Sequence, residues 1–209
     1  MTLAPADIDA RYEFRTFGQD FASAAYRMAR LSEPVPEDFW ERHSQEIYLI
    51  SETDDRQNIK LRDAVLDIKV LTRTSGVLEQ WKPVVKVGFP ISSEKLETEV
   101  LPHFSHELSQ PVGVSLAESE FLDIVRKNPE LHIAYVQKER HGYKVNGNIC
   151  EVASVLVNGA RLTTVSVEST DVDAVMKTIA DIGLNDFENI NYVQAIQRVI
   201  GLSERPFAN

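Results

Sequence analysis

The sequence predicts an α+β protein built on a large antiparallel sheet. Several short segments alternate charged and apolar side chains, which is typical of strands with one polar and one apolar face. Four or five other segments repeat apolar residues at helical spacing. In addition, Asn158-Gly159 is a strong turn signal between two strand-like segments, which favours a hairpin over a parallel crossover.

The first half of the chain contains most of the predicted strands. Arg11, Glu13 and Arg15 alternate with apolar residues up to Gly18, which ends the first strand. An amphipathic helix follows, and Pro34 breaks it. In order, the predicted strands are 11–17, 46–51, two within 57–71 and one within 78–89, and the helix lies within 20–31.

The second half mixes helices with longer strands. Ser92 begins a segment that resembles a helix cap, and Gly183 stands where a C-terminal helix cap is expected. The predicted helices are 92–101, 118–127, 171–182 and 191–200, and the predicted strands are 131–140, 148–157 and 161–169, with a turn region around Gly142 and Gly147. The total is seven or eight strands, mostly in hairpins.

Length and composition define the broad class of the protein. The 209 residues suit a single domain, 1–209, in which residues 1–10 are expected to be a flexible N-terminus. The net charge of −10 argues against a partner such as a nucleic-acid duplex or an anionic membrane. No apolar run is long enough to span a membrane. The single cysteine fits a reducing compartment, so we expect a cytoplasmic protein. Nothing in the pattern specifies an oligomeric state.

Projected by their period, the strands place ionisable side chains on one side of the sheet. The cations are Arg11, Arg15, Lys60, Arg62, Lys69, Lys138 and Arg140, and the carboxylates are Glu13, Glu151 and Glu168, with Asp67 as a further candidate. Two architectures fit this pattern. One is an open sheet with its polar face in water, and the other is a barrel whose charged faces line the interior while helices pack outside.

In the barrel, the interior cations would need a counter-charge. Two like charges about 6 Å apart repel by roughly 3 kcal/mol at an effective dielectric constant of about 20. Arginine and lysine both suit phosphate oxygens, and carboxylates are good ligands for Mg²⁺ or Mn²⁺. A polyphosphate bound with its divalent metal would therefore satisfy both sets of charges.

Five features, in order along the chain, resemble a known family. They are Arg11-Tyr-Glu13-Phe-Arg15, Lys60-Leu-Arg62 with Lys69, Lys138-Glu-Arg140, Glu151 with Ser166-Val-Glu168, and Asn191-Tyr192. Over residues 11–200 this ordered set resembles the CYTH superfamily, the triphosphate tunnel metalloenzymes. The resemblance implies an antiparallel eight-stranded barrel, open at both ends, with helices packed outside.

The resemblance also implies a function and a site. The function would be metal-dependent hydrolysis of a triphosphate, either inorganic or a nucleoside or thiamine ester, inside the barrel. By the resemblance, Glu13 and Glu168 would be catalytic, and Glu13, Glu151 and Glu168 would hold Mg or Mn. The substrate would be bound by Arg11, Arg15, Lys60, Arg62, Lys69, Lys138 and Arg140.

The sequence departs from the family pattern mainly in its carboxylates. Arg11 stands where the family has the first Glu of Glu-x-Glu-x-Lys, Arg15 replaces the Lys, and Ser166 replaces the first Glu of the closing Glu-x-Glu. The chain could therefore be a triphosphatase, or a module of the same fold that binds a polyphosphate or nucleotide without hydrolysing it. A structural domain with a solvated charged face is a third alternative.

Two other features have ordinary interpretations. His103 and His106 are spaced as metal ligands can be, but no third ligand lies at a recognisable distance, so we expect surface histidines. Cys150 next to Glu151 could be an activated thiol, but a cysteine in a strand is more often a small buried apolar residue.

Overall fold

A closed antiparallel barrel of eight strands forms the centre of the protein. The computed structural model describes residues 10–108 and 114–207, so the predicted flexible N-terminus lies almost entirely outside the described residues. The strand order around the barrel is β1-β10-β9-β8-β2-β3-β4-β5, and β5 pairs again with β1. The strands are β1 (Arg11–Gly18), β2 (Glu41–Ser51), β3 (Gln57–Arg62), β4 (Val65–Ser75), β5 (Leu78–Gly88), β8 (Leu131–Val145), β9 (Asn148–Val157) and β10 (Ala160–Ser169).

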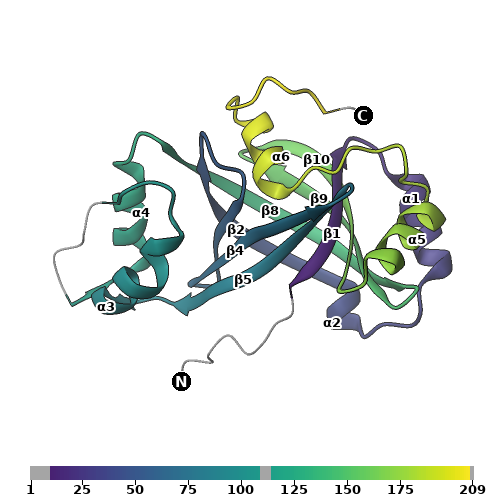
Figure 1. Ribbon diagram of the computed structural model, residues 1–209, viewed down its shortest axis with the longest axis horizontal. Helices are drawn as coiled ribbons and strands as arrows, with labels where there is room; N and C mark the ends of the chain where they lie inside the picture. Colours follow the sequence, from purple (N-terminus) through teal and green to yellow (C-terminus); the bar gives the residue numbers. More distant parts are fainter. Residues whose placement is uncertain (1–9, 109–113, 208–209) are drawn as a thin grey trace.

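Helices lie around this barrel in several groups (Figure 1). Among the described residues these are α1 (Ala22–Leu31), α2 (Glu37–Trp40), α3 (Ser93–Lys95), α4 (Glu118–Arg126), α5 (Val172–Ile182) and α6 (Tyr192–Val199). A π-helical turn (Leu96–Val100) and a 3-10 turn (Leu101–His103) continue α3, and β6 (Ile91–Ser92) and β7 (Ser115–Leu116) form a separate two-stranded sheet. None of the described helices is long and apolar enough to cross a membrane.

The outer face of β1, β9 and β10 is covered by α1 and α5, which lie side by side (Figure 1). Phe14, Cys150 and Val165 from the strands join Met28 of α1 and Ile179 of α5 in one buried cluster. Each of these strands alternates, so its apolar residues face these helices while its charged residues face the interior. The period-2 pattern of the sequence thus determines which side of the sheet the two helices cover.

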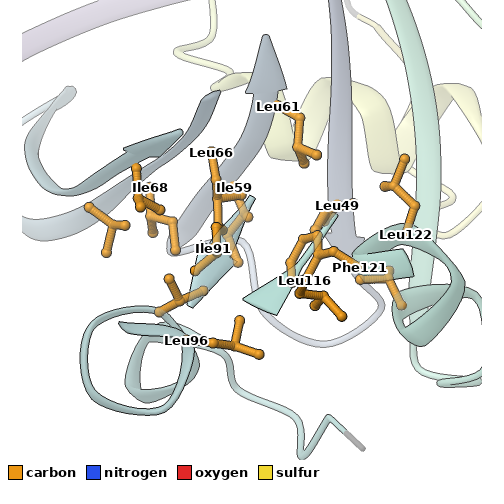
Figure 2. Close-up of a cluster of buried hydrophobic side chains, with 14 of the residues drawn as sticks. Leu49, Ile59, Leu61, Leu66, Ile68, Ile91, Leu96, Leu116, Phe121 and Leu122 are labelled. Carbon is orange, nitrogen blue, oxygen red and sulfur yellow. The ribbon is translucent and has the colours of Figure 1, made fainter. Parts of the chain in front are cut away.

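A second cluster covers the outer face of β2, β3, β4 and β5 (Figure 2). Leu61, Leu66 and Ile68 are fully buried there against residues of the α3 and α4 region, such as Leu96 and Phe121. Ser92 caps α3 by accepting a hydrogen bond from the Lys95 amide, as the sequence predicts. The alternation of residues 57–71 therefore separates this outer core from the charged interior.

Helix α6 differs from the others because it packs against inward-facing side chains. Tyr48, Val136 and Val155 lie on the same strand faces as the charged interior residues, and they form a buried cluster with Val193 and Ile196 of α6. Apolar side chains therefore fill one end of the barrel interior. The arrangement differs from a tunnel open at both ends, because α6 closes this end.

Most of the predicted elements are confirmed, although some strands are longer than predicted, including β4, which continues past residue 71 to Ser75. The hairpin through Asn158-Gly159 joins β9 to β10, and Gly183 caps α5 with a left-handed φ of 79°. In contrast, β2 begins at Glu41 rather than at residue 46, and β8 continues to Val145. Gly142 therefore lies inside a strand and not in a turn. Residues 41–45 are all polar because the outer face of this part of β2 is exposed to solvent. The segment therefore lacks the alternation of polar and apolar residues that identifies a strand.

Candidate functional site

The charged faces of the barrel strands enclose one cavity of about 240 Å³. It occupies the part of the barrel interior that the apolar cluster around α6 does not fill. The cavity is lined by Glu13, Arg15, Arg42, Ser44, Glu46, Tyr48, Asn58, Lys60, Arg62, Asp67, Lys69, Trp81, Lys138, Arg140, Glu151, Glu168, Asn191 and Tyr192. Closure of the sheet therefore brings together side chains from strands that are far apart in the sequence.

Nine of the ten site residues predicted from the sequence line this cavity. They are Glu13, Arg15, Lys60, Arg62, Lys69, Lys138, Arg140, Glu151 and Glu168. Arg11 is the exception, because it is not among the lining residues and its side chain is 41% exposed. Its guanidinium Nη1 lies 3.6 Å from a carboxylate oxygen of Glu168, so Arg11 acts on the cavity through that residue.

The lining also includes charged residues that the sequence reasoning missed. Arg42 and Glu46 both come from β2, and Asp67, which was only a candidate, lines the cavity from β4. The expected excess of seven cations over three carboxylates is therefore wrong. Seven cationic and five acidic side chains line the cavity, which leaves a net charge of +2. The sequence gives only a weak indication of the role of Glu46. It is a single charged residue at the start of the apolar segment 47–50, which shows no alternation between faces.

Glu46 is the counter-ion of the β3 cations. It is 3% exposed, and its two carboxylate oxygens lie 3.3 Å from Lys60 Nζ and 3.2 Å from Arg62 Nη1. Tyr48 and Ser44 donate hydrogen bonds to the same carboxylate. Burial by itself would raise the pKa of Glu46, but Lys60, Lys138, the Tyr48 hydroxyl and Arg62 lower it to about 2. Glu46 is therefore ionised at neutral pH.

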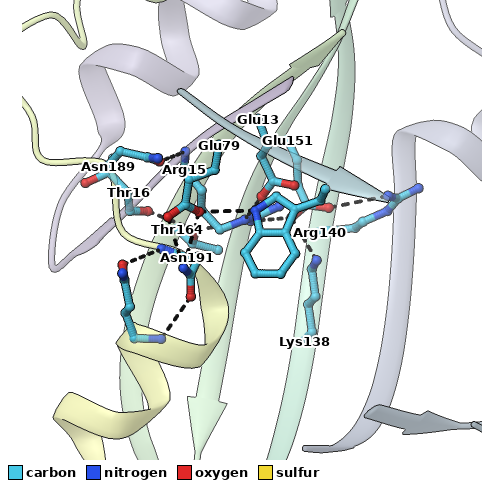
Figure 3. Close-up of polar contacts among 12 residues, drawn as sticks. Glu13, Arg15, Thr16, Glu79, Lys138, Arg140, Glu151, Thr164, Asn189 and Asn191 are labelled. Carbon is cyan, nitrogen blue, oxygen red and sulfur yellow. Dashed lines mark hydrogen bonds and ion pairs between the residues drawn. The ribbon is translucent and has the colours of Figure 1, made fainter. Parts of the chain in front are cut away.

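Glu151 has the same role for the cations of β1 and β8 (Figure 3). Its carboxylate lies 2.7 Å from Lys138 Nζ, 3.1 Å from Arg15 Nη1 and 3.3 Å from Arg140 Nη1. Burial would raise the pKa of Glu151, but Lys138, Arg15 and Arg140 together hold it far below the usual range. Three cations from two strands thus converge on one carboxylate.

Three further cations lie near Lys60 in the β3 region. Burial lowers the pKa of Lys60; Glu46 raises it, but Lys138, Lys69 and Arg62 lower it further, and the net shift is downward. Burial is the largest cause of this shift, and the three neighbouring cations add to it. With seven cationic and five acidic side chains in its lining, the cavity has a positive charge that favours binding of an additional anion.

Carboxylates gather on the opposite wall of the cavity. Glu13 on β1 lies directly opposite Glu168 on β10 and Glu79 on β5, so three glutamates form a row across neighbouring strands. Burial and the Glu13 charge raise the pKa of Glu168. Burial also raises the pKa of Glu79, although Asn191 and Trp81 donate hydrogen bonds to it. Glu13 and Glu168 line the cavity and Glu79 lies next to Glu13 outside the lining, so acidic residues gather on the side of β1 and β10.

Aromatic rings form the inner end of the cavity. The rings of Tyr48 and Tyr192 stack with centroids 5.5 Å apart, and the Arg15 guanidinium lies 4.7 Å from the centroid of Tyr192. Asn191 caps α6 by accepting a hydrogen bond from the Gln194 amide, which fixes Tyr192 at the first position of the helix. The cap and the ring stack together hold the closed end in place.

Several donors around the cavity have no partner within the described residues. The side chains of Arg42 and Lys69 form no ion pair or hydrogen bond there. Arg140 Nε and the Tyr192 hydroxyl are buried without a hydrogen-bond partner in the same part of the chain. Buried polar groups are normally satisfied, so these atoms are positions where a ligand or water would bind.

The predicted metal ligands do not form a ligand set in this arrangement. Glu151 is occupied by three cations, and Glu13 accepts a 2.6 Å hydrogen bond from Arg15 Nε. Across the described residues, no group of three or more His, Cys, Asp or Glu side chains is arranged to hold a metal ion. Arg15, where the resemblance expects Lys, and Ser166, where it expects Glu, both change the surroundings of these carboxylates. Mg or Mn therefore remains a prediction.

The other sequence candidates lie away from the cavity. Cys150 is buried, and burial raises the pKa of its thiol to about 12, so it is a small apolar residue of the outer core as expected. The expectation of a surface histidine is wrong for His106, whose side chain is 9% exposed. Its Nε2 lies 2.8 Å from Ser51 Oγ and its Nδ1 lies 3.0 Å from Glu130.

Comparison with known proteins supports the fold. The sequence matches no family profile and no curated protein. A conserved hypothetical protein of Pyrococcus furiosus has a similar structure, with a TM-score of 0.51 and 16% identity over 88% of this chain and 98% of that chain. This likeness agrees with the closed eight-stranded antiparallel barrel, which confirms the fold that the sequence predicts.

Two further solved structures are slightly less similar. One is from Bacillus halodurans and is described as a candidate adenylate cyclase, with a TM-score of 0.49 and 16% identity over 88% of this chain and 95% of that chain. The other is an adenylyl cyclase candidate from Hippeastrum, described as having a dominant triphosphatase activity, with a TM-score of 0.49 and 12% identity over 95% of this chain and 99% of that chain.

Proposed function

We propose that the cavity binds the phosphate groups of a small triphosphate-containing molecule, either inorganic triphosphate or a nucleoside or thiamine ester. The observation that carries this proposal is the convergence of seven cationic side chains, from five strands, on one cavity. Hydrogen bonds between such cations and phosphate oxygens are among the strongest in proteins. The burial of these cations argues against the alternative of a solvated sheet face. Removing charges from water costs free energy, and a sheet face open to water would not incur that cost.

The net charge of the lining bears on how such a ligand would bind. A single phosphate monoester carries a charge of about −1.5 to −2 at neutral pH, which the net +2 of the lining residues would balance. A triphosphate chain carries more negative charge than this. We therefore expect it to bind most tightly as its complex with Mg²⁺ or Mn²⁺, with the metal arriving as part of the ligand.

Calorimetry with tripolyphosphate at low salt tests this function. Binding should be measurable in EDTA and should tighten when Mg²⁺ is added, whereas orthophosphate binding should change little with Mg²⁺. Both affinities should fall as salt rises, because ions screen partly exposed charges. Failure of the wild-type protein to bind tripolyphosphate with or without Mg²⁺ would contradict the proposal.

Metal-dependent hydrolysis of the same ligand is the second candidate function. The observation that favours it is the pair of opposing carboxylates, Glu13 and Glu168, whose repulsion a divalent cation would relieve. The experiment is a phosphate-release assay with inorganic, nucleoside and thiamine triphosphates, with Mg²⁺, Mn²⁺ or EDTA. Binding without release in all conditions would identify a binding module, and release in EDTA would argue against a metal role.

A further inference from the structure

Arg42 and Arg140 occupy facing positions near the exposed side of the cavity. They are directly opposite partners in the register of β2 and β8, and both line the cavity. Arg42 is exposed, whereas the Arg140 side chain is 24% exposed. Like charges directly opposite each other on neighbouring strands destabilise a sheet. An anion shared by both arginines would make this arrangement favourable. Within the described residues, Arg140 has a carboxylate partner, Glu151, but Arg42 has none.

The charge of this pair is incompletely compensated. Arg140 uses Nη1 to contact Glu151 at 3.3 Å, while its Nε is buried and has no partner in the described residues. The Arg42 side chain forms no ion pair or hydrogen bond with any of residues 10–108 or 114–207. Two arginines with unused side-chain donors are therefore cross-strand partners in the lining of the cavity.

Helix α2 holds one of these guanidinium groups in a fixed orientation. The Arg140 guanidinium carbon lies 5.8 Å from the centre of the Phe39 ring, so the aromatic face limits where this side chain can turn. Gly142, two residues further along β8, permits this packing. A Cβ at position 142 would lie only 2.5 Å from the Phe39 carbonyl oxygen, so any larger residue would push α2 away.

We propose that Arg42 and Arg140 together bind one phosphate group of the ligand at the outer part of the cavity. The inference rests on the proposed function and adds to it a residue, Arg42, that the sequence resemblance does not include. A planar guanidinium can donate two parallel hydrogen bonds to phosphate oxygens, which a lysine ammonium cannot do. The free Nε edge of Arg140 and the unpartnered Arg42 side chain would provide these donors, while Glu151 and Phe39 position Arg140.

The test compares Arg42→Ala, Arg42→Lys and a matched control, Arg161→Ala, in the full chain. Arg161 is an exposed arginine on β10 whose Nη1 donates to Ser154, and it does not line the cavity. Calorimetry with tripolyphosphate should show about 10- to 100-fold weaker binding for Arg42→Ala, which corresponds to the usual worth of a charged hydrogen bond. Arg42→Lys should bind with intermediate affinity, and Arg161→Ala should bind as the wild type does.

Thermal unfolding without ligand gives a second, independent readout. Removing Arg42 removes a like-charge contact, so Arg42→Ala should unfold at the same temperature as the wild type or higher. A lower unfolding temperature would indicate a structural role and overturn the inference. Unchanged tripolyphosphate affinity in Arg42→Ala would overturn the inference while leaving the proposed function intact. No binding by the wild type would overturn both.

Discussion

Glu13 and Glu168 lie directly opposite each other on β1 and β10, and both line the cavity. Each has an arginine beside it, since Arg15 Nε is 2.6 Å from Glu13 and Arg11 Nη1 is 3.6 Å from Glu168. The looser of these contacts leaves Glu168 the less neutralised carboxylate. The pKa of Glu168 is raised, first by burial and then by the charge of Glu13, and Lys69 and Arg11 only partly offset this.

Glu168→Gln should therefore separate hydrolysis from binding. If the protein hydrolyses triphosphates, phosphate release with Mg²⁺ should fall by at least about 100-fold, the range expected when a residue close to the chemistry is lost. Tripolyphosphate binding should persist, because the cations are untouched. Glu139→Gln, at an exposed position on β8, is the matched control. Full activity in Glu168→Gln would exclude the predicted role.

Arg62→Ala should weaken triphosphate binding, since it removes one of the two β3 cations held by Glu46. The expected loss is about 1.5–3 kcal/mol, the usual worth of a hydrogen bond to a charged group. Calorimetry at low salt measures it, with Arg161→Ala as the control. An affinity equal to that of the wild type would show that Arg62 serves only to neutralise Glu46.

The pKa of Glu46 predicts how stability depends on pH. Its folded-state value of about 2 lies below the ordinary value of 4.5. A lowered carboxyl pKa stabilises the folded state above pH 4.5, and this contribution of about 3 kcal/mol is lost as the pH falls towards 2. Urea unfolding of Glu46→Gln should show lower stability than the wild type at pH 7, with the difference shrinking below pH 4.5. A difference independent of pH would contradict this assignment.

Ile196→Ala tests whether α6 is part of the core. Ile196 is completely buried in the cluster that fills one end of the barrel interior. Removing its side chain should lower the free energy of unfolding by about 2–5 kcal/mol. Met176→Ala is the control, because this α5 residue is 40% exposed and should change stability by less than about 0.5 kcal/mol. Similar small effects for both variants would mean that α6 packs only loosely.

The sequence determined the strands and their two faces where one face is charged and the other apolar. The alternation around Lys60 and Lys69 predicted both the outer core and the inward cations, since each residue of a strand points opposite to the next. Turn and cap residues are equally local, and Gly159 and Gly183 were therefore predictable. These features depend on neighbours in sequence, which a single chain reveals directly.

Only the tertiary structure decided how the charges are paired and which end of the barrel is filled. Glu151 meets Arg15 across 136 residues of sequence, and Glu46 meets Lys60 only because β2 and β3 are neighbours in the closed sheet. Tyr48 and Leu49 point to opposite faces of β2, and both are apolar. The alternation of residue types therefore could not reveal that the face with Tyr48 packs against α6. A strand's period specifies its two faces, but the partners of each face depend on closure of the barrel, which local sequence does not encode.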